Sequence, residues 1–347
     1  MNRHTSESSP TVPVALVVSE LLGGGAEQSM SMLHQHLYQN GYPTLLIALN
    51  SDSRRETPND LIITLARKKM SGLFSIFSTF VRYRKVLRGS QVKTVVLNCE
   101  LAELIGSVAT PRGLKIITVE HTSRPWVGRR LVGLFARTLL EVRGVHWITV
   151  NAAEPRVWPF QRVARVIRNP ISVQTGELHG ELRIAFVGRL SKDKRPDLVA
   201  RVAKSLQIPA DFFGTGHLLA ELKSFWSSQL ISFFGFVENV WELVPQDSLV
   251  IVPSAYEGDG RVVAEAIARG NPLLLADNED LRRFSLPERN YFLNELDLEE
   301  KLFEAKKTRS WMSFVAPAEI RDELIELRDI KIIGDQWLSL LDEPKKN

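Results

Sequence analysis

Cysteine is almost absent from this chain of 347 residues, and long apolar runs are missing altogether. The single cysteine, Cys99, excludes an internal disulfide and any metal site built from several cysteines, and it is compatible with a reducing cytoplasm. No apolar run reaches the ~18 residues that a membrane-spanning helix needs. Residues 1–11 are polar and lack the apolar stretch of a secretory signal, so we expect a disordered tail there.

The composition that is present is typical of a soluble globular protein, with 44% hydrophobic and 24% charged residues. The charge is unevenly distributed along the chain. Residues 1–170 contain 22 Lys and Arg against 11 Asp and Glu, a net charge of +11, and residues 171–347 contain 22 against 29, a net charge of −7. This asymmetry supports two domains, and it indicates that the first half meets an anionic surface or ligand.

Short apolar strands alternate with helical stretches, a pattern that predicts parallel, doubly wound α/β sheets. The strands expected in the first half are 12–18, 44–49, 94–98, 115–120 and 146–150. The pattern then restarts, with strands expected at 183–190, 210–216, 231–235, 249–254 and 271–277. We therefore predict a first Rossmann-like domain at 12–170, a second at 171–313, and C-terminal helices at 314–347 that can cross back to the first domain.

Two glutamates, Glu257 and Glu265, stand eight residues apart around a glycine loop. The loop follows the strand expected at 249–254, and ligands of parallel α/β sheets bind outside the carboxyl ends of strands. Glu265, one turn into the following helix, can accept hydrogen bonds from a ribose diol, and Glu257 would face a sugar. Acids in the first turns of an ordinary helix give the same pattern.

The backbone between these glutamates also suits a phosphate. A helix that begins near Arg261 would point the free N–H groups of Gly260, Arg261 and Val262 out of its N-terminus. Gly258 and Gly260 would let the backbone approach a ligand closely.

A second motif, GRLSKDKRPD, follows the strand expected at 183–190. Arg189 and Lys194 are spaced so that one short loop can bring both cations to a diphosphate. A solvated basic loop is the alternative interpretation.

Two further features occur in the first half. Three glycines, at 23–25, open a helix after the first strand, but they lack the G-x-G-x-x-G spacing of a dinucleotide site. His121 directly follows the strand expected at 115–120, where it can donate to a sugar hydroxyl or to a developing charge. A lone histidine is also often structural.

Taken in order, these segments resemble the retaining glycosyltransferases of family 4, which have the GT-B fold. The resemblance rests on GGGAE, EH, VGRLSKDKRPD, FFGTG, ISFFGFVENV and PSAYEGDGRVVAEAIARGNPLL. The last segment is similar to the E-x7-E signature of the family, with Glu257 and Glu265 as its two glutamates. The similarity covers about residues 12–297 and is most specific over 183–276. It implies two Rossmann-like, doubly wound domains that face each other across a cleft.

The resemblance implies that the second domain binds a nucleotide-sugar donor. Arg189 and Lys194 would hold the diphosphate, Glu265 would bind the ribose, and Glu257 with the following backbone would contact the transferred sugar.

In the first domain, the resemblance implies that Gly24 and Gly25 line the cleft near the phosphates and that His121 meets the sugar. Transfer would retain the anomeric configuration, and the family needs neither a metal nor a cofactor. The catalytic candidates are therefore Glu257, His121, Arg189 and Lys194.

The chain departs from the family at Asp259, where an aromatic or aliphatic residue is usual, and at Arg261, where an aliphatic residue is usual. An acid beside a diphosphate would repel it unless Arg261 or another cation pairs with the acid.

The predicted function is transfer of a hexose from a UDP- or GDP-linked sugar to a glycan or lipid-linked acceptor, in bacterial surface polysaccharide or lipopolysaccharide biosynthesis. A catalytically silent GT-B scaffold or subunit remains an alternative because of Asp259, and a sugar-nucleotide epimerase is another. No aromatic–basic RNA-binding motif is present, so nucleic acid is not an expected partner.

The segment 67–89 combines seven Lys and Arg with a series of Leu, Ile, Phe and Val residues. A basic helix with an aromatic face can lie on an anionic membrane, whereas the same pattern also fits a helix that packs on a sheet. We expect a cytoplasmic protein, and a peripheral contact with the inner face of the cytoplasmic membrane is one of the two interpretations of this segment.

Overall fold

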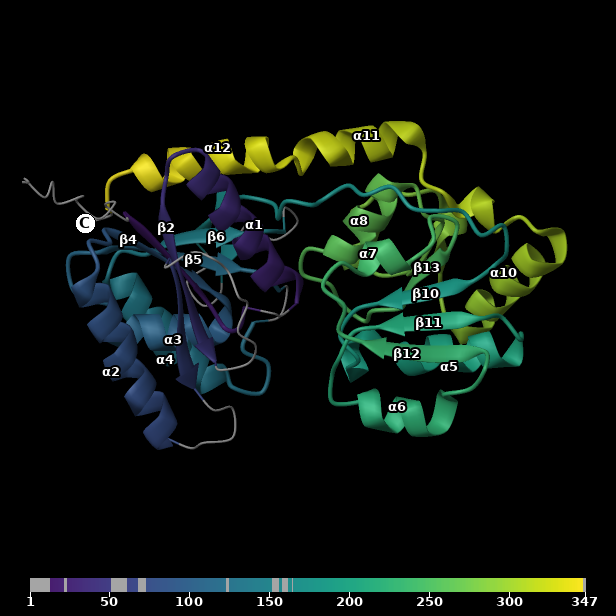
Figure 1. Ribbon diagram of the computed structural model, residues 1–347, viewed down its shortest axis with the longest axis horizontal. Helices are drawn as coiled ribbons and strands as arrows, with labels where there is room; N and C mark the ends of the chain where they lie inside the picture. Colours follow the sequence, from purple (N-terminus) through teal and green to yellow (C-terminus); the bar gives the residue numbers. More distant parts are fainter. Residues whose placement is uncertain are drawn as a thin grey trace, which may run out of the picture. The chain divides into compact units, whose positions relative to one another are not determined.

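The structure is a computed structural model that describes residues 13–21, 24–50, 61–67, 73–122, 125–151, 156–157, 162–163 and 165–345. The chain forms two compact units (Figure 1). The first unit contains Met1–Arg168 and Ile330–Asn347, and the second contains Asn169–Asp329. The tail expected at residues 1–11 lies outside the described residues.

The first unit is built on a seven-stranded parallel sheet. Its strands are β1 (Val14–Val18), β2 (Thr44–Asn50), β3 (Ile62–Arg67), β4 (Thr94–Asn98), β5 (Lys115–Glu120), β6 (His146–Thr149) and β9 (Arg165–Val166). They are ordered β3-β2-β1-β4-β5-β6-β9, and all neighbouring pairs are parallel. A separate antiparallel pair is formed by β7 (Arg156–Val157) and β8 (Arg162–Val163).

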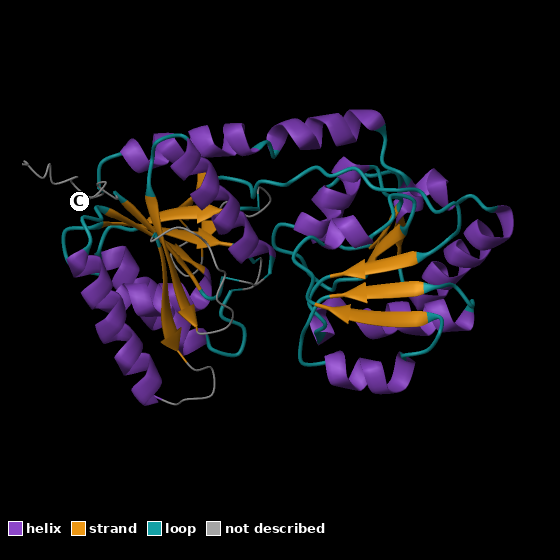
Figure 2. Cartoon of the chain, in the orientation of Figure 1, coloured by secondary structure: helices purple, strands orange, loops and turns teal. Residues whose placement is uncertain are grey.

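Helices cover both faces of this sheet (Figure 2). They are α1 (Gly25–Gln39), α2 (Leu73–Gly89), α3 (Cys99–Ala109), α4 (Arg130–Val142) and α12 (Ile330–Asp342). The core clusters divide them: α1 and α12 pack with Leu16 of β1, whereas α2, α3 and α4 pack with Ala15 and Val17 of the same strand. This division follows from the alternation of side chains along a strand.

The second unit contains a six-stranded parallel sheet with the order β12-β11-β10-β13-β14-β15. Its strands are β10 (Ile184–Val187), β11 (Ala210–Phe213), β12 (Ile231–Gly235), β13 (Leu249–Val252), β14 (Leu273–Ala276) and β15 (Tyr291–Phe292). Its helices are α5 (Pro196–Ser205), α6 (Leu219–Trp226), α7 (Val240–Leu243), α8 (Arg261–Arg269), α9 (Glu279–Arg282), α10 (Glu295–Thr308) and α11 (Ala318–Leu327). Short 3-10 helices occur at Lys192–Lys194, Glu288–Asn290 and Trp311–Phe314. Together the two sheets confirm the predicted pair of doubly wound α/β domains.

The C-terminal segment 314–347 contains two helices, α11 and α12, and they belong to different units. α11 packs against α8 in the second unit, and α12 packs against α1 in the first. Gly334 permits the approach of α12 to α1, because a Cβ at this position would collide with the imidazole of His36. The C-terminal end of α12 is capped by Lys115, whose Nζ donates to the carbonyl of Leu340 at 2.5 Å.

We predict that α12 is a stabilising part of the first unit. Trp337 is buried in the core cluster that also contains α1 side chains, so Trp337→Ala should lower the free energy of unfolding by about 3–5 kcal/mol. Ile332→Ala, on the exposed side of the same helix, is the control and should cost less than about 1 kcal/mol. Chemical denaturation followed by circular dichroism measures both, and equal losses would contradict this packing.

Candidate functional site

The strand order of the second unit creates a switch point between β10 and β13. These two strands are hydrogen-bonded neighbours, while the chain continues from β10 towards β11 on one side and from β13 towards β14 on the other. In open α/β sheets a ligand crevice forms outside the carboxyl ends of the strands at such a point. The two sequence motifs, GRLSKDKRPD and PSAYEGDGR, directly follow these two strands.

An ion pair joins the two loops. The Nζ atom of Lys194 lies 2.5 Å from Oε1 of Glu257, and the hydroxyl of Ser254 donates to the same oxygen at 2.8 Å. The backbone adds a further link, because the Ala255 N–H donates to the carbonyl of Asp193 at 2.8 Å. Two residues that the sequence analysis placed on the diphosphate and the sugar of one donor thus contact each other directly.

Glu265 is buried on α8 and holds two partners. Its Oε2 accepts a hydrogen bond from the indole nitrogen of Trp241 at 2.9 Å, and its Oε1 accepts one from Nε of Arg261 at 2.7 Å. A carboxylate has about four lone-pair positions, so two bonds leave capacity for further hydroxyl donors.

Arg261, whose backbone was predicted to bind phosphate, is therefore not the partner of Asp259. That partner is Arg328, which ends α11. The Nη1 and Nη2 atoms of Arg328 donate to the two oxygens of Asp259 at 2.7 and 2.9 Å, and the Asn169 side chain donates to Oδ2 at 2.9 Å. All three side chains are buried. Sequence spacing favoured Arg261 because it is two residues away, whereas the fold supplies a cation 69 residues later.

The burial of Asp259 explains how an acid can stand in this loop. Burial by itself would raise the pKa of the Asp259 carboxyl, but the charge and the hydrogen bonds of Arg328, with the bond from Asn169, hold the pKa below its ordinary value. The acid is thus a neutralised anchor of the turn.

Gly260 completes this turn at the N-terminus of α8. Its φ of 63° is left-handed, and a Cβ there would lie 2.8 Å from the ring of Phe284. Both the conformation and the close approach require glycine.

The sequence analysis missed a cation next to the turn, Arg283. A Cβ at Gly260 would lie 3.3 Å from its Nη2, and both Nη atoms are buried without a hydrogen bond to the other described residues. Burial lowers the pKa of this guanidinium, and the nearby carboxylates of Asp259, Asp280 and Glu257 oppose the shift. The signal in the sequence that could have identified Arg283 is its position in NEDLRRF, the segment that follows β14.

Arg189, the remaining predicted cation, is exposed just beyond the end of β10 and makes no ion pair within the described part of the chain.

In the first unit, the predicted residues also lie at the carboxyl ends of strands. Gly24 is exposed and precedes the first residue of α1, Gly25. The His121 ring nitrogen Nε2 is hydrogen-bonded to Oδ1 of Asn98, the last residue of β4. The Nδ2 atom of Asn98 is buried and makes no hydrogen bond to any other described residue.

A second residue missed from the sequence, Glu120, stands beside His121 at the end of β5. Burial raises the pKa of its carboxyl to about 7; Arg137, to which it is bonded, opposes the shift, and the charge of Glu103 adds to it. Perturbed carboxyls of this kind occur at functional sites and in structural ion-pair networks alike.

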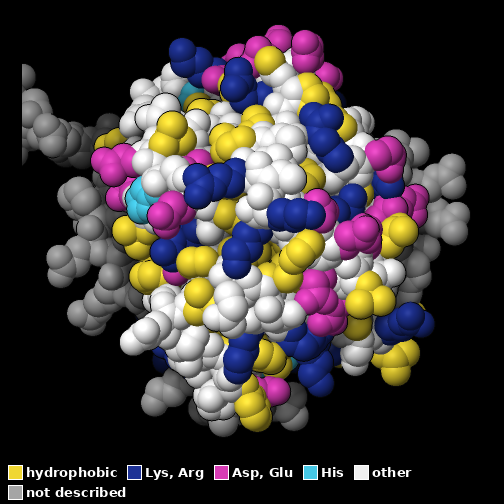
Figure 3. All heavy atoms as spheres, turned by 90° about the vertical axis from the view of Figure 1, so that its right-hand side faces the viewer, with side chains coloured by type: hydrophobic (Ala, Val, Ile, Leu, Met, Phe, Trp, Pro, Cys, Tyr) yellow, Lys and Arg dark blue, Asp and Glu magenta, His cyan; other side chains and the backbone are white. Residues whose placement is uncertain are grey.

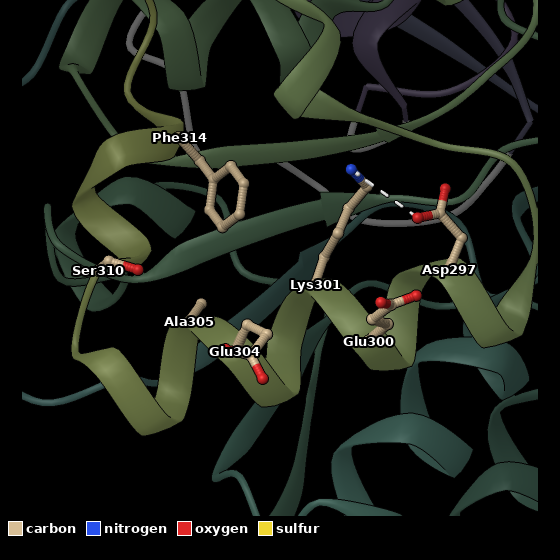
Figure 4. A pocket seen from close by; sticks show the side chains of 7 residues that line it. All are labelled: Asp297, Glu300, Lys301, Glu304, Ala305, Ser310 and Phe314. Carbon is tan, nitrogen blue, oxygen red and sulfur yellow. Dashed lines mark ion pairs between the residues drawn. The ribbon is translucent and has the colours of Figure 1, made fainter.

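A hollow of about 360 Å³ lies elsewhere in the second unit, along α10 (Figure 4). Lys301 and Asp297 face each other there, with Nζ and Oδ1 3.8 Å apart. The hollow is lined by Asp297, Glu300, Lys301, Glu304, Ala305, Ser310 and Phe314. None of the predicted site residues belongs to it. Within the described part of the chain, no group of three or more His, Cys, Asp or Glu side chains could hold a metal ion.

We predict that Asp259→Asn destabilises the second unit by about 3–5 kcal/mol, because it leaves the buried charge of Arg328 without its partner. The pKa of Asp259 is lowered in the folded chain, so its contribution is present above the unfolded pKa and disappears as the pH falls through the folded pKa. The difference between the variant and the parent should therefore shrink below about pH 4.

Two further variants control this measurement by chemical denaturation. Asp322→Asn removes an exposed acid of α11 that pairs with Arg321, and it should change the free energy of unfolding by less than about 0.5 kcal/mol. Replacing the pair together, as Asp259→Leu with Arg328→Met, should recover most of the loss. A loss in Asp259→Asn that does not depend on pH would contradict the ion pair.

Comparisons with known proteins support this fold. Residues 168–290 match the family model described as Glycosyl transferases group 1. Two curated relatives from Escherichia coli, the O-antigen biosynthesis glycosyltransferase WbnH and the probable O-antigen biosynthesis glycosyltransferase WbiN, are each 27% identical over 214 residues, which is 58% of this chain and 63% of theirs.

Among solved structures, Anabaena HepE in complex with UDP and glucose is similar with a TM-score of 0.75 and 14% identity, over 95% of this chain and 99% of that one. Sucrose-phosphate synthase from Thermosynechococcus elongatus is similar with a TM-score of 0.73 and 15% identity, over 94% and 98%. The chain therefore has the GT-B fold of these structures, and its second unit carries the match to Glycosyl transferases group 1.

Proposed function

We propose that this protein is a retaining glycosyltransferase that transfers a hexose from a UDP- or GDP-linked sugar to a glycan or lipid-linked acceptor. The observation that carries the proposal is the ion pair of Lys194 and Glu257 between the loops that follow β10 and β13, with Glu265 on α8, the helix that begins at the end of the second loop. This is the position at which a doubly wound sheet binds a nucleotide.

The diphosphate is assigned to the N-terminal turn of α8 together with Lys194 and Arg189. The backbone N–H groups of Gly260, Arg261 and Val262 begin this helix, and a helix N-terminus stabilises an anion. Lys194 is bound to Glu257, so it exchanges or shares that partner when a phosphate arrives. Its charge then stabilises the diphosphate as the bond to the sugar breaks.

The ribose is assigned to Glu265 and the sugar side to Glu257. Trp241 and Arg261 fix the carboxylate of Glu265, so that its remaining lone pairs are already oriented for a diol. Glu257 is fixed in the same manner by Ser254 and by Lys194. Binding groups held before the ligand arrives lose less entropy on binding.

The acceptor is assigned to the first unit, with His121 and its partner Asn98 as the residues that contact a sugar hydroxyl. Retention of configuration, and catalysis without a metal or cofactor, are carried over from the resemblance to family 4. The names of WbnH and WbiN favour a role in surface polysaccharide synthesis, and the complex of HepE with UDP and glucose favours a UDP-linked donor.

A catalytically silent scaffold was kept open by Asp259 alone. Because Asp259 is buried and neutralised by Arg328, it does not present a negative charge to a diphosphate. This pairing favours the enzyme over the scaffold.

Replacing Glu265 with Gln should weaken the binding of UDP, or of GDP if the donor is GDP-linked, by roughly tenfold to a hundredfold. The reason is that hydrogen bonds to a charged group contribute about 1.5–3 kcal/mol each. Calorimetric titration measures the affinity. Glu304→Gln, in the hollow along α10, is the control and should bind the nucleotide as the parent does. If Glu304→Gln weakened binding and Glu265→Gln did not, the donor site would be misplaced.

Lys194→Met should weaken the binding of UDP by about tenfold and leave the binding of uridine unchanged, because only the diphosphate contacts this cation. Lys192→Met, at an exposed cation two residues away, should affect neither ligand. A loss of uridine binding in Lys194→Met would show that the residue acts on the fold and not on the phosphates.

Glu257→Ala should lower kcat more than it raises KM in a transfer assay with the matching nucleotide sugar.

A further inference from the structure

The helix α4 exposes a stripe of large apolar side chains on its outer side and buries a charged residue, Arg137, on its inner side. Leu131 is 83% exposed, Phe135 is 55% exposed and Val142 is 82% exposed, and Leu134 is exposed between them. These residues recur at intervals of three, four and seven, so they form one stripe along the helix about 17 Å long. Surface helices of water-soluble proteins normally show the opposite arrangement.

Contacts on the inner side hold α4 in this orientation. Arg137 is fully buried, and its Nε and Nη2 atoms donate to the two carboxylate oxygens of Glu103 at 3.1 and 3.2 Å. Glu103 also accepts from the indole nitrogen of Trp126 at 2.9 Å. Gly133 lies against this indole so closely that a Cβ would collide with it. The helix therefore cannot rotate its apolar stripe into the core without breaking a buried ion pair.

The stripe belongs to a larger surface, which we call the outer face: the exposed side chains of α2, α3 and α4. The helix α3 packs against both α2 and α4, and the three helices cover the same side of the sheet. Phe77 of α2 is 64% exposed, and Val81 of α2 and Val108 of α3 are exposed as well. Thus the segment 67–89, for which the sequence left membrane contact and packing on the sheet as alternatives, adds exposed apolar side chains to a wider surface, to which α4 contributes most of them.

The exposed charges of the outer face are positive. Residues 61–151 contain fifteen Lys and Arg but only four acids. None of the four acids, Glu100, Glu103, Glu120 and Glu141, is exposed, and each is hydrogen-bonded. The exposed cations on or next to the three helices are Arg82, Lys85, Arg88, Arg129 and Arg130. By contrast, the face of the chain in Figure 3 shows Lys and Arg side chains interspersed with Asp and Glu.

We propose that the outer face binds the surface of an anionic lipid bilayer, with the α4 stripe in the headgroup–acyl boundary and the cations against the lipid phosphates. Apolar side chains flanked by cations, without exposed carboxylates, are complementary to such a surface. A second copy of this chain is a poorer occupant, because it would bring two cationic faces together. None of the described helices is long and apolar enough to cross a membrane, so the contact is interfacial. This inference rests on the first unit alone and does not depend on the proposed donor site.

Flotation assays at low salt test the proposal. They compare vesicles of phosphatidylcholine alone with vesicles that also contain about 30% phosphatidylglycerol. The parent chain should float with the anionic vesicles and not with the neutral ones. Leu131→Asp with Phe135→Asp should bind at least about tenfold less, and so should Lys85→Glu with Arg88→Glu and Arg130→Glu.

Matched controls are available in the second unit. Leu293 and Leu296 are 74% and 77% exposed, so Leu293→Asp with Leu296→Asp places the same charge on apolar surface positions away from the outer face and should float like the parent. Lys223→Glu with Lys307→Glu serves the same purpose for the charge reversals. Unchanged melting temperatures and unchanged circular dichroism spectra show that each variant is folded.

Three outcomes would overturn the proposal: no flotation of the parent with anionic vesicles, equal flotation of the α4 variant, or equal flotation of the charge-reversal variant. Analytical ultracentrifugation in the absence of lipid can give a fourth such outcome. In it, the parent forms a dimer, the α4 variant is monomeric, and the parent does not bind vesicles. That result would identify the outer face as an interface between copies.

Discussion

The divergence of the chain at two neighbouring parallel strands is the constraint on which the candidate site depends. Because β10 and β13 lie side by side and the chain leaves them in opposite directions, their following loops meet at one edge of the sheet without a strand crossing between them. This topology brings Lys194 to Glu257 across 63 residues of sequence and starts α8 beside them. A positive and a negative side chain from two distant loops therefore meet at one edge of the sheet.

The turn before α8 is held by contacts that reach both ends of the second unit. Asp259 is bonded to Asn169, the first residue of that unit, and to Arg328, which is next to its last residue. Gly260 then turns the backbone with a left-handed φ of 63°. A buried ion pair contributes little net stability compared with apolar packing, but it defines one geometry, and breaking it is costly. Its value at this position is to fix where the backbone donors of α8 point.

The sequence could predict the parts of the structure that depend on local pattern. Apolar runs located five strands of each sheet but missed the edge strands β3, β9 and β15. Glycine with charged residues after strands located the loops of the candidate site. It could not predict the partner of Asp259, because Arg328 is 69 residues away and lies at the end of a helix whose packing against α8 is a tertiary event. Arg283 was missed for the same reason. The sequence also could not predict that the α4 stripe points outward. Helical periodicity identifies an apolar face, but the buried ion pair of Arg137 and Glu103 decides which side of α4 faces the core.

The most direct test of the central claim is a crystal structure of the chain with UDP and, separately, with GDP. The account predicts that the diphosphate of one of them lies within hydrogen-bonding distance of the backbone N–H groups at 260–262 and of Nζ of Lys194, with the ribose hydroxyls on Glu265. A nucleotide bound in the hollow along α10, or one that lies at the switch point without contacting Glu265, would contradict it.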